Sequence, residues 1–434
     1  MYFLLKKTLL NASIKNILYL NLGGSILNKS YYSILVSQAT TNLGFALYTM
    51  SVTLFLFNIT ESTVITSLIT FVSIIARMFG SATLPIFSNK IKFRTLLITS
   101  QIVQLLFLTS LLFVYSRSYS SILLFYSFVI IGIVSFFNGW FSPLKSTIVK
   151  SVVPKEKRVQ ANSLLSTVDQ TFQFVAWAFG GLLLAFLGKS ITLEITLFLI
   201  VISLISFLSL RTHDNSKEQI NNDSLLKSLT NGWSYLFKNP KLRVLIIMDL
   251  IESWAGMIWI AAISLAFVKE ALHKGEPWWG YINGAYYLGT MIGGFIIYRL
   301  SKKLQGNLLF FMFLGATLYG ALTFIYGFIS NPIIALIAVV FMGPAYILRD
   351  LSQETFFQNE VDEQTLSKIM SARSAMVQFI FMLSVLAVGT IAEVFGARFV
   401  YISAGSLLLI SAMYGSYQLL FKTKKMEHKE NLNY

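Results

Sequence analysis

The sequence predicts an all-α membrane protein with twelve transmembrane helices in two six-helix halves. The composition, a series of long apolar segments and the distribution of basic residues lead to this prediction. Hydrophobic residues make up 55% of the 434 residues and charged residues only 12%, about half the charged fraction of a typical soluble domain. Segments of about 20 apolar residues are long enough to cross a bilayer, so the chain is expected to pass through a membrane many times.

Twelve apolar segments are bounded by charged or turn residues. They cover residues 32–57, 63–87, 95–115, 121–147, 162–187 and 190–210, and then 243–268, 279–299, 308–329, 332–350, 371–395 and 398–421. The chain therefore divides into an N-terminal arm (1–31), a first half (32–210), a linker (211–241), a second half (242–421) and a tail (422–434).

Basic residues are concentrated on one side of this layout. With the N-terminus inside the cell, 28 of the 34 Lys and Arg residues fall in inner loops, inner span ends and tails, and 5 fall in outer loops. This bias follows the positive-inside rule and predicts that both termini are cytoplasmic. The formal net charge of +15 is thus a topology signal, and we expect no nucleic-acid partner. The expected partner is the plasma-membrane bilayer of a bacterium-like cell, in which the chain acts as a monomer.

Two segments outside the spans are expected to lie near the membrane surface. Residues 1–20 mix Leu and Ile with Lys and Asn, which suits either an interfacial amphipathic helix or a disordered arm. The linker is expected to form a helix before Pro240, either on the inner membrane surface or packed on the loops. One face of this helix carries Leu225, Leu226, Leu229, Trp233, Leu236 and Phe237.

An internal duplication appears when the chain is shifted by 208 residues. Seven identities then fall within one 42-residue stretch. The pairs are Thr147/Thr355, Val153/Val361, Ser163/Ser371, Ser166/Ser374, Gln170/Gln378, Gly181/Gly389 and Gly188/Gly396. Two six-span halves repeated in parallel are typical of a large transporter class, in which the halves rock about a central site.

The residue inventory argues against enzyme chemistry. The chain has no cysteine and three histidines that never pair at metal-ligand spacing, so we expect no metal site and no thiol chemistry. Gly188-Lys189-Ser190 looks like the end of a phosphate loop, but Leu183 stands where that motif needs a glycine. We expect no cofactor, and ATP is not the expected energy source.

Two stretches resemble a known family. Phe141–Gly188, with Val153-Pro154-x-Glu156, the run from Ala161 to Leu164 and Gly180-Gly181, is similar to spans 4 and 5 of the major facilitator superfamily. More narrowly, it resembles the drug:proton antiporter branch that contains macrolide efflux and enterobactin exporter proteins, as does Val268–Gly294 at spans 7 and 8. The resemblance implies the major facilitator fold.

The chain departs from the pattern of this family at two places. Asn89 stands where the loop between spans 2 and 3 carries an aspartate in the family, followed here by Lys90, Lys92 and Arg94. Ala176-Trp177 replaces a glycine-proline pair. The resemblance makes Asn89, Lys90 and Arg94 candidates for a gating loop, although the basic residues also serve as topology anchors.

Asp249 and Glu252 are the most unusual residues of the sequence, because they lie in the apolar segment 243–268. Three residues apart, they share one helical face. An ionised carboxylate inside a bilayer costs several kcal/mol, on the order of 2.5 or more, unless it faces protein or water, and such groups can carry protons. We expect Glu252 near mid-membrane and Asp249 at a shallower level closer to water. The alternative is a structural ion pair, with Arg77 of span 2 as the expected buried cation.

Other polar residues inside spans have weaker signals. Asp169 either titrates or faces the inner loops near the start of its helix. Gln170 and Gln378, at equivalent repeat positions, bind substrate across the cavity or bond between helices. Together with Trp259 they are the candidates for lining a substrate cavity.

The predicted function is secondary active transport. The resemblance implies export of a small amphiphilic substrate, either a macrolide-like drug or a secreted metabolite such as a siderophore, in exchange for protons. The alternatives are uptake of a small nutrient and a sensor or assembly role without transport.

Overall fold

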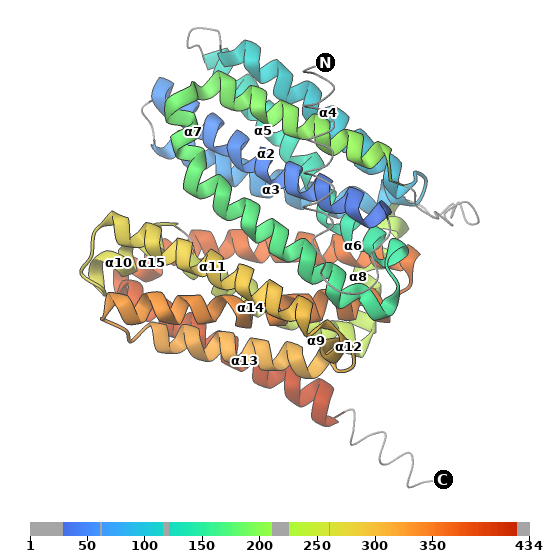
Figure 1. The fold of residues 1–434 in the computed structure, drawn as a ribbon, viewed down its shortest axis with the longest axis vertical. Helices are drawn as coiled ribbons and strands as arrows, with labels where there is room; N and C mark the ends of the chain where they lie inside the picture. The colour runs from blue at the N-terminus through green and yellow to red at the C-terminus, as the bar shows by residue number, and fades with distance from the viewer. Residues whose placement is uncertain (1–28, 61–62, 116–120, 211–224, 260, 423–434) are drawn as a thin grey trace, which may run out of the picture.

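The structure, a computed structural model, describes residues 29–60, 63–115, 121–210, 225–259 and 261–422. The regular elements of this described part are all helices. Figure 1 shows them as two bundles, with the first half (blue to green) above the second half (yellow to red). Residues 1–28 and 423–434 lie outside the described part, so the predictions for the arm and the tail stay predictions.

The helices of the first half correspond to the six expected spans. They are α2 (Lys29–Thr60), α3 (Thr63–Ser88), α4 (Phe93–Tyr115), α5 (Ser121–Asn138), α6 (Phe141–Val152) and α7 (Arg158–Leu208). Span 4 was expected as one segment over 121–147, but it is divided between α5 and α6. The division falls at Gly139, which lies directly against the backbone of Arg77 in α3. A side chain at position 139 would collide with that backbone.

The second half repeats this plan after the linker helix α8 (Leu225–Lys238). Its elements are α9 (Pro240–Ala255), the 3-10 turn η3 (Gly256–Trp259), α10 (Ala261–Glu270), α11 (Glu276–Arg299), α12 (Ser301–Gln305), α13 (Leu308–Tyr326), α14 (Pro332–Glu360), α15 (Glu363–Ser416) and a π-helical end (Tyr417–Lys422). Asn239 and Asn331 cap α9 and α14 through their side chains, each followed by a proline at the first helical position. Eight helical stretches of the described part are long and apolar enough to cross a membrane by length and composition alone.

The repeat predicted from the sequence is confirmed in the backbone. The two longest helices, α7 and α15, each turn at one glycine with positive φ, Gly188 (φ 76°) and Gly396 (φ 79°). Left-handed backbone of this kind favours glycine because a Cβ is strained there. Since the two glycines are 208 residues apart, α7 supplies spans 5 and 6 and α15 supplies spans 11 and 12.

Each half has its own hydrophobic core. Two clusters of buried side chains fill the first half, one around Leu84 and Leu144 and one around Leu56 and Leu111. Two further clusters, built almost entirely from second-half residues, fill the other bundle. Close glycine contacts tighten the packing of the second half, since Gly289 and Gly293 of α11 lie against the backbone of α14.

The halves are joined by polar bonds at one end of the bundle. We call the end that carries α6, α8 and α12, on the right in Figure 1, the linker end, and the end with the Gly188 and Gly396 turns the hairpin end. At the linker end, the Arg158 guanidinium donates to the Gln358 carbonyl and to Asn359 Oδ1, both at 2.7 Å. Asn162 Nδ2 donates to Gln358 Oε1 and Thr355 Oγ1, both at 2.9 Å. The start of α7 is thereby tied to the end of α14.

The linker helix α8 packs across both halves at this end. It contacts α3 of the first half and α15 of the second. Gly232 lies against the Lys368 backbone and Leu236 is fully buried, while Tyr235 and Phe237 are exposed. Of the expected apolar face, Leu236 is buried and Trp233 is partly buried, but Phe237 is exposed. The side chains of Leu225, Leu226 and Leu229 lie outside the described part, so their burial stays a prediction.

Candidate functional site

The segment that carries Asp249 and Glu252 breaks directly after them. The sequence suggested one continuous span over 243–268, but α9 ends at Ala255, the 3-10 turn η3 covers Gly256–Trp259, and α10 starts at Ala261. Interrupted helices inside transporters often form binding sites, because the freed backbone groups line a cavity. The break here places both carboxylates in the last turns of α9.

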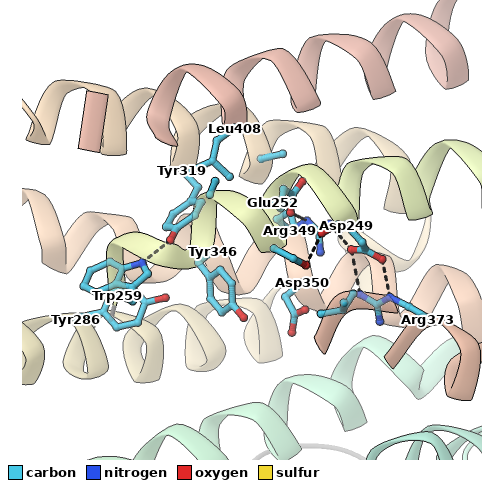
Figure 2. A pocket seen from close by; sticks show the side chains of 15 residues that line it. Asp249, Glu252, Trp259, Tyr286, Tyr319, Tyr346, Arg349, Asp350, Arg373 and Leu408 are labelled. Atoms are coloured by element: carbon cyan, nitrogen blue, oxygen red, sulfur yellow. Dashed lines mark hydrogen bonds and ion pairs between the residues drawn. The ribbon is translucent and has the colours of Figure 1, made fainter. Parts of the chain in front are cut away.

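A cavity of about 370 Å3 lies beside this break. Figure 2 shows its two ends, one charged and one aromatic. The charged end, with Asp249, Glu252, Arg349 and Arg373, lies nearer the linker end, where α9 begins. The aromatic end is formed by Trp259, Tyr286, Tyr319 and Tyr346.

Asp249 is locked in place by two arginines and an amide. Its side chain is only 4% exposed. Arg349 donates to Oδ1 at 2.8 Å, and Arg373 donates from Nε to Oδ2 at 2.6 Å and from a terminal nitrogen to Oδ1 at 3.2 Å. Gln353 Nε2 adds a fourth bond to Oδ2 at 3.0 Å. Charge-assisted, two-pronged bonds of this type are strong and geometrically specific.

Glu252 is held more loosely. Arg349 Nε lies 2.7 Å from Glu252 Oε2, but the Nε–H is not directed at a hydrogen-bond acceptor in the described residues, so the contact is an ion pair. The Ser411 hydroxyl lies 3.3 Å from Oε1. With its side chain 17% exposed, Glu252 is the acid of this pair that is easier to detach and to reach from the cavity.

The network has one more carboxylate than guanidinium groups. Glu354 lies 3.4 Å from Arg373, which gives three acids, Asp249, Glu252 and Glu354, for the two bases Arg349 and Arg373. Its formal charge is −1 when every group is ionised. One proton on a carboxylate makes these five groups neutral, and Asp350, which also lines the cavity, adds a further carboxylate beside them.

Two expectations about these acids are wrong. Arg77 is not their partner: both acids pair with Arg349, and Asp249 also pairs with Arg373. Asp249 is also not the acid closer to water: its side chain is 4% exposed and that of Glu252 is 17% exposed, because the two guanidinium groups cover Asp249.

The aromatic end of the cavity is a connected group of rings. Trp259 Nε1 donates to the Tyr319 hydroxyl at 2.8 Å, and the Trp259 and Tyr286 ring centroids are 4.3 Å apart. Tyr319 and Tyr346 follow at 5.6 Å. Trp259, a predicted cavity residue, therefore lines the cavity. Three tyrosines that were not predicted from the sequence lie beside it.

Gln170 and Gln378 lie at the seam between the halves. The Thr290 hydroxyl of α11 is 3.4 Å from Gln170 Oε1 of α7. Gln378 Nε2 of α15 is 3.5 Å from the Ser81 hydroxyl of α3. Each therefore joins a helix of one half to a helix of the other, in equivalent places of the repeat.

Asp169 and the loop candidates lie away from the charged cavity. Asp169 of α7 accepts hydrogen bonds from Gln38 and Asn42 of α2, the latter at 2.6 Å. Arg94 donates to the Phe207 and Leu208 carbonyls at the end of α7, where a cation stabilises a helix terminus. Lys90 is exposed and Asn89 partly buried, and a gating role for these three residues stays a prediction.

The sequence does not identify Arg349 and Arg373 as site residues, because both stand near the ends of apolar runs. Arg349 and Arg373 were counted among the inner-side anchors, but α14 continues to Glu360 and α15 already begins at Glu363. Both side chains are thus well inside helices. The available signal was Gln353, four residues after Arg349 and so on the same helical face.

Comparison with known proteins gives the family. The profile of the Major Facilitator Superfamily matches residues 31–349. The uncharacterized MFS-type transporter YfmI of Bacillus subtilis (strain 168) is 58% identical over 403 residues, 93% of this chain and 99% of the relative. YjbB, another uncharacterized MFS-type transporter of the same strain, is 28% identical over 389 residues, 88% of this chain and 94% of the relative.

Solved structures agree on the fold. A bacterial homologue of the iron transporter ferroportin, in an outward-facing state, superimposes with a TM-score of 0.76 at 12% identity, over 90% of this chain and 99% of that one. The fucose:proton symporter of E. coli superimposes with a TM-score of 0.67 at 15% identity, over 89% and 99%. At these identities the likeness concerns the fold alone. The family match and the YfmI alignment, together with the two repeated six-span halves, show that the chain is a multi-pass membrane protein that belongs to the major facilitator superfamily.

Proposed function

We propose that the protein is a proton-coupled secondary transporter that exports an amphiphilic compound across the plasma membrane by alternating access. The observation that supports it best is the network of Asp249, Glu252, Glu354, Arg349 and Arg373, which has one excess carboxylate and borders a cavity. Glu252 is the proposed proton site because it lines the cavity and is loosely held.

The cavity suits an amphiphile with a ring. Ligand sites are usually apolar with a few placed polar groups, and aromatic pairs favour edge or offset contacts with other rings. The four aromatic side chains offer such contacts, and the charged end lies beside them. A secreted aromatic metabolite fits this combination through its ring, and a macrolide-like drug would contact the aromatic side chains through its apolar surface.

Protonation of Glu252 would change the network in a defined way. The neutral acid no longer attracts Arg349, which then turns to Asp249 alone. This change alters the local contacts of α9 and α14 and links the proton to the shape of the cavity. Coupling needs such a difference in interaction between two states.

Alternating access would use the separate cores of the halves. Each half packs on itself, while polar bonds such as Arg158–Asn359 and Asn162–Thr355 join them at the linker end. If this end is cytoplasmic, as the basic residues predict, the structure corresponds to a state closed to the cytoplasm. Breaking these bonds would allow the linker end to open.

Proteoliposomes with an imposed pH gradient and no ATP test the proposal. Radiolabelled erythromycin and a fluorescent aromatic dye serve as first substrates, and pyranine reports proton flux. We expect substrate movement that stops with a protonophore and runs in the export direction. A strict need for ATP, or inward accumulation driven by protons, would contradict the proposal, and the absence of any transport would favour the sensor role.

Two matched variants locate the proton site. Glu252→Gln removes a cavity-lining carboxylate, and Glu354→Gln removes one of similar exposure, 20% against 17%, that is not part of the lining. We expect Glu252→Gln to keep substrate exchange down a gradient but to lose proton-driven accumulation at least tenfold, while Glu354→Gln keeps both. Equal loss in the two variants would assign the effect to the network charge rather than to Glu252.

A further inference from the structure

A second cavity, of about 300 Å3, lies at the seam between the two halves and contains a cation that needs a partner. Its polar lining comes from both halves: Arg77, Ser81, Asn138 and Ser142 from the first, Ser374 and Gln378 from the second. The described residues of the lining include no carboxylate. Within the described part of the chain, the Arg77 guanidinium has neither a hydrogen-bond acceptor nor an ion-pair partner, and its Nε atom is fully buried.

An arginine in this position is unusual on physical grounds. Its side chain stays protonated in proteins, and charges inside membrane proteins are normally paired or face water. Arg349 and Arg373, two other arginines inside long helices, are both paired with carboxylates. Arg77 lines a polar cavity and has no partner in the described residues, so a ligand in this cavity can supply the missing acceptor to the guanidinium group.

The backbone beneath Arg77 is held firmly. Gly139 lies directly against the Arg77 backbone, and Gly80 lies against the backbone of Phe136 in α5. Ser81 donates to the Gly139 carbonyl at 2.8 Å. Close glycine contacts of this type hold α3 and α5 together, which fixes the point from which the Arg77 side chain extends.

The location of the cavity links it to the movement of the halves. The Ser81 and Ser374 hydroxyls, from α3 and α15, are 3.1 Å apart. A ligand bound to Arg77 would therefore touch both halves beside this bond. Val377 lines this cavity and also the cavity with the aromatic rings, so the two cavities are neighbours.

We propose that Arg77 binds an anionic group, such as a carboxylate or a sulfonate, carried by the transported amphiphile. The guanidinium fork matches the paired oxygens of such groups, and the neighbouring hydroxyls and amides provide further donors. The claim that the anionic group belongs to a transported compound rests on the proposed function. The anion preference of the cavity does not depend on transport.

The absence of native cysteine allows a direct test of that preference. Ser142 is exposed and lines the cavity, so Ser142→Cys is labelled in the purified full chain with two thiol reagents of opposite charge. These are the anionic sulfonatoethyl and the cationic trimethylammonium-ethyl methanethiosulfonates, each rate being divided by that of free cysteine. Asn138→Cys is a second reporter position in the same lining.

We expect the normalised ratio of anionic to cationic rates to exceed one and to fall about tenfold when Arg77→Gln is added, because the two reagents respond to a removed charge with opposite sign. Arg77→Lys should keep most of the ratio. Arg243→Gln, which removes an exposed arginine of α9, is the matched control and should leave it unchanged. An unchanged ratio in Arg77→Gln, or no reaction with either reagent at both positions, overturns the proposal.

Transport gives a separate readout. Among compounds carried in the proteoliposome assay, Arg77→Gln should reduce transport of anionic ones about tenfold and leave neutral ones unaffected. If transport proves independent of protons while the labelling result holds, the proposed coupling fails and the anion site stands. If carried compounds include no anionic member, the anion site as a substrate site is wrong.

Discussion

Replacing Asp249 by asparagine should destabilise the fold far more than replacing Glu252 by glutamine. Asp249 accepts four bonds from Arg349, Arg373 and Gln353, and its side chain is 4% exposed. An asparagine keeps one acceptor oxygen, loses the charge and turns an amide group towards two guanidinium groups. Removing one partner of a buried ion pair typically costs about 3–5 kcal/mol.

The surroundings place the expected cost at the lower end of that range. Arg349 keeps Glu252 at 2.7 Å and Arg373 keeps Glu354 at 3.4 Å, so neither base is left without a counter-charge. We expect Asp249→Asn to lower the free energy of unfolding by about 3 kcal/mol. This corresponds to a drop of about 5 °C in Tm, because Tm shifts less per kcal/mol in a large chain than in a small one. For Glu252→Gln we expect about 1 kcal/mol, because Asp249 still neutralises Arg349.

The assay is thermal unfolding of the purified protein in detergent, followed by intrinsic fluorescence. Lys241→Gln, which breaks the solvent-exposed pair with Glu360 at 2.8 Å, is the control and should change Tm by less than about 1 °C, since exposed pairs contribute little. Arg373→Gln combined with Asp249→Asn should cost less than the sum of the two single changes, as expected for directly coupled residues. A wild-type Tm for Asp249→Asn, or an equal drop for Glu252→Gln, would refute the assignment of Asp249 as the anchor of the network.

Three further predictions test other parts of the molecule. Gly188→Ala and Gly396→Ala should each lower the stability by about 1 kcal/mol, seen as a lower Tm, because alanine is strained at positive φ; an unchanged Tm would show that these turns relax easily. Cysteine at Ser216 should be shielded from impermeant reagents outside intact cells and cysteine at Ser118 should react, and the reverse pattern would invert the topology. Arg158→Gln should weaken the closure of the linker end, which would appear as faster labelling of linker-end cysteines, and an unchanged rate would show that the other seam contacts are sufficient.

Much of the fold could be predicted from the sequence because the deciding signals are local. Apolar runs of bilayer length locate the spans, and the paired glycines 208 residues apart locate the two turns inside α7 and α15. The divisions of spans 4 and 7 were missed. They depend on contacts with other helices, such as Gly139 against Arg77, which hydropathy does not contain.

The site was only half predictable for a similar reason. Asp249 and Glu252 stand out because a carboxylate is costly in an apolar segment. Arg349 and Arg373 do not stand out, because cations near span ends are normally topology anchors. Only the continuation of α14 and α15 beyond the apolar runs reveals that these two arginines are interior residues.

The two halves share a backbone plan but differ in their polar chemistry. Gly188 and Gly396 turn alike, and in both halves the first and fifth spans meet at a polar contact. In the first half, Asp169 on the fifth span accepts from Gln38 and Asn42 on the first, and these donors are neutral. In the second half the acids stand on the first span, and a base on the fifth faces them. Of these two contacts only the second is a network of opposite charges with an excess carboxylate, so under the proposed coupling a proton changes the charge balance more there than at the contact of the first half.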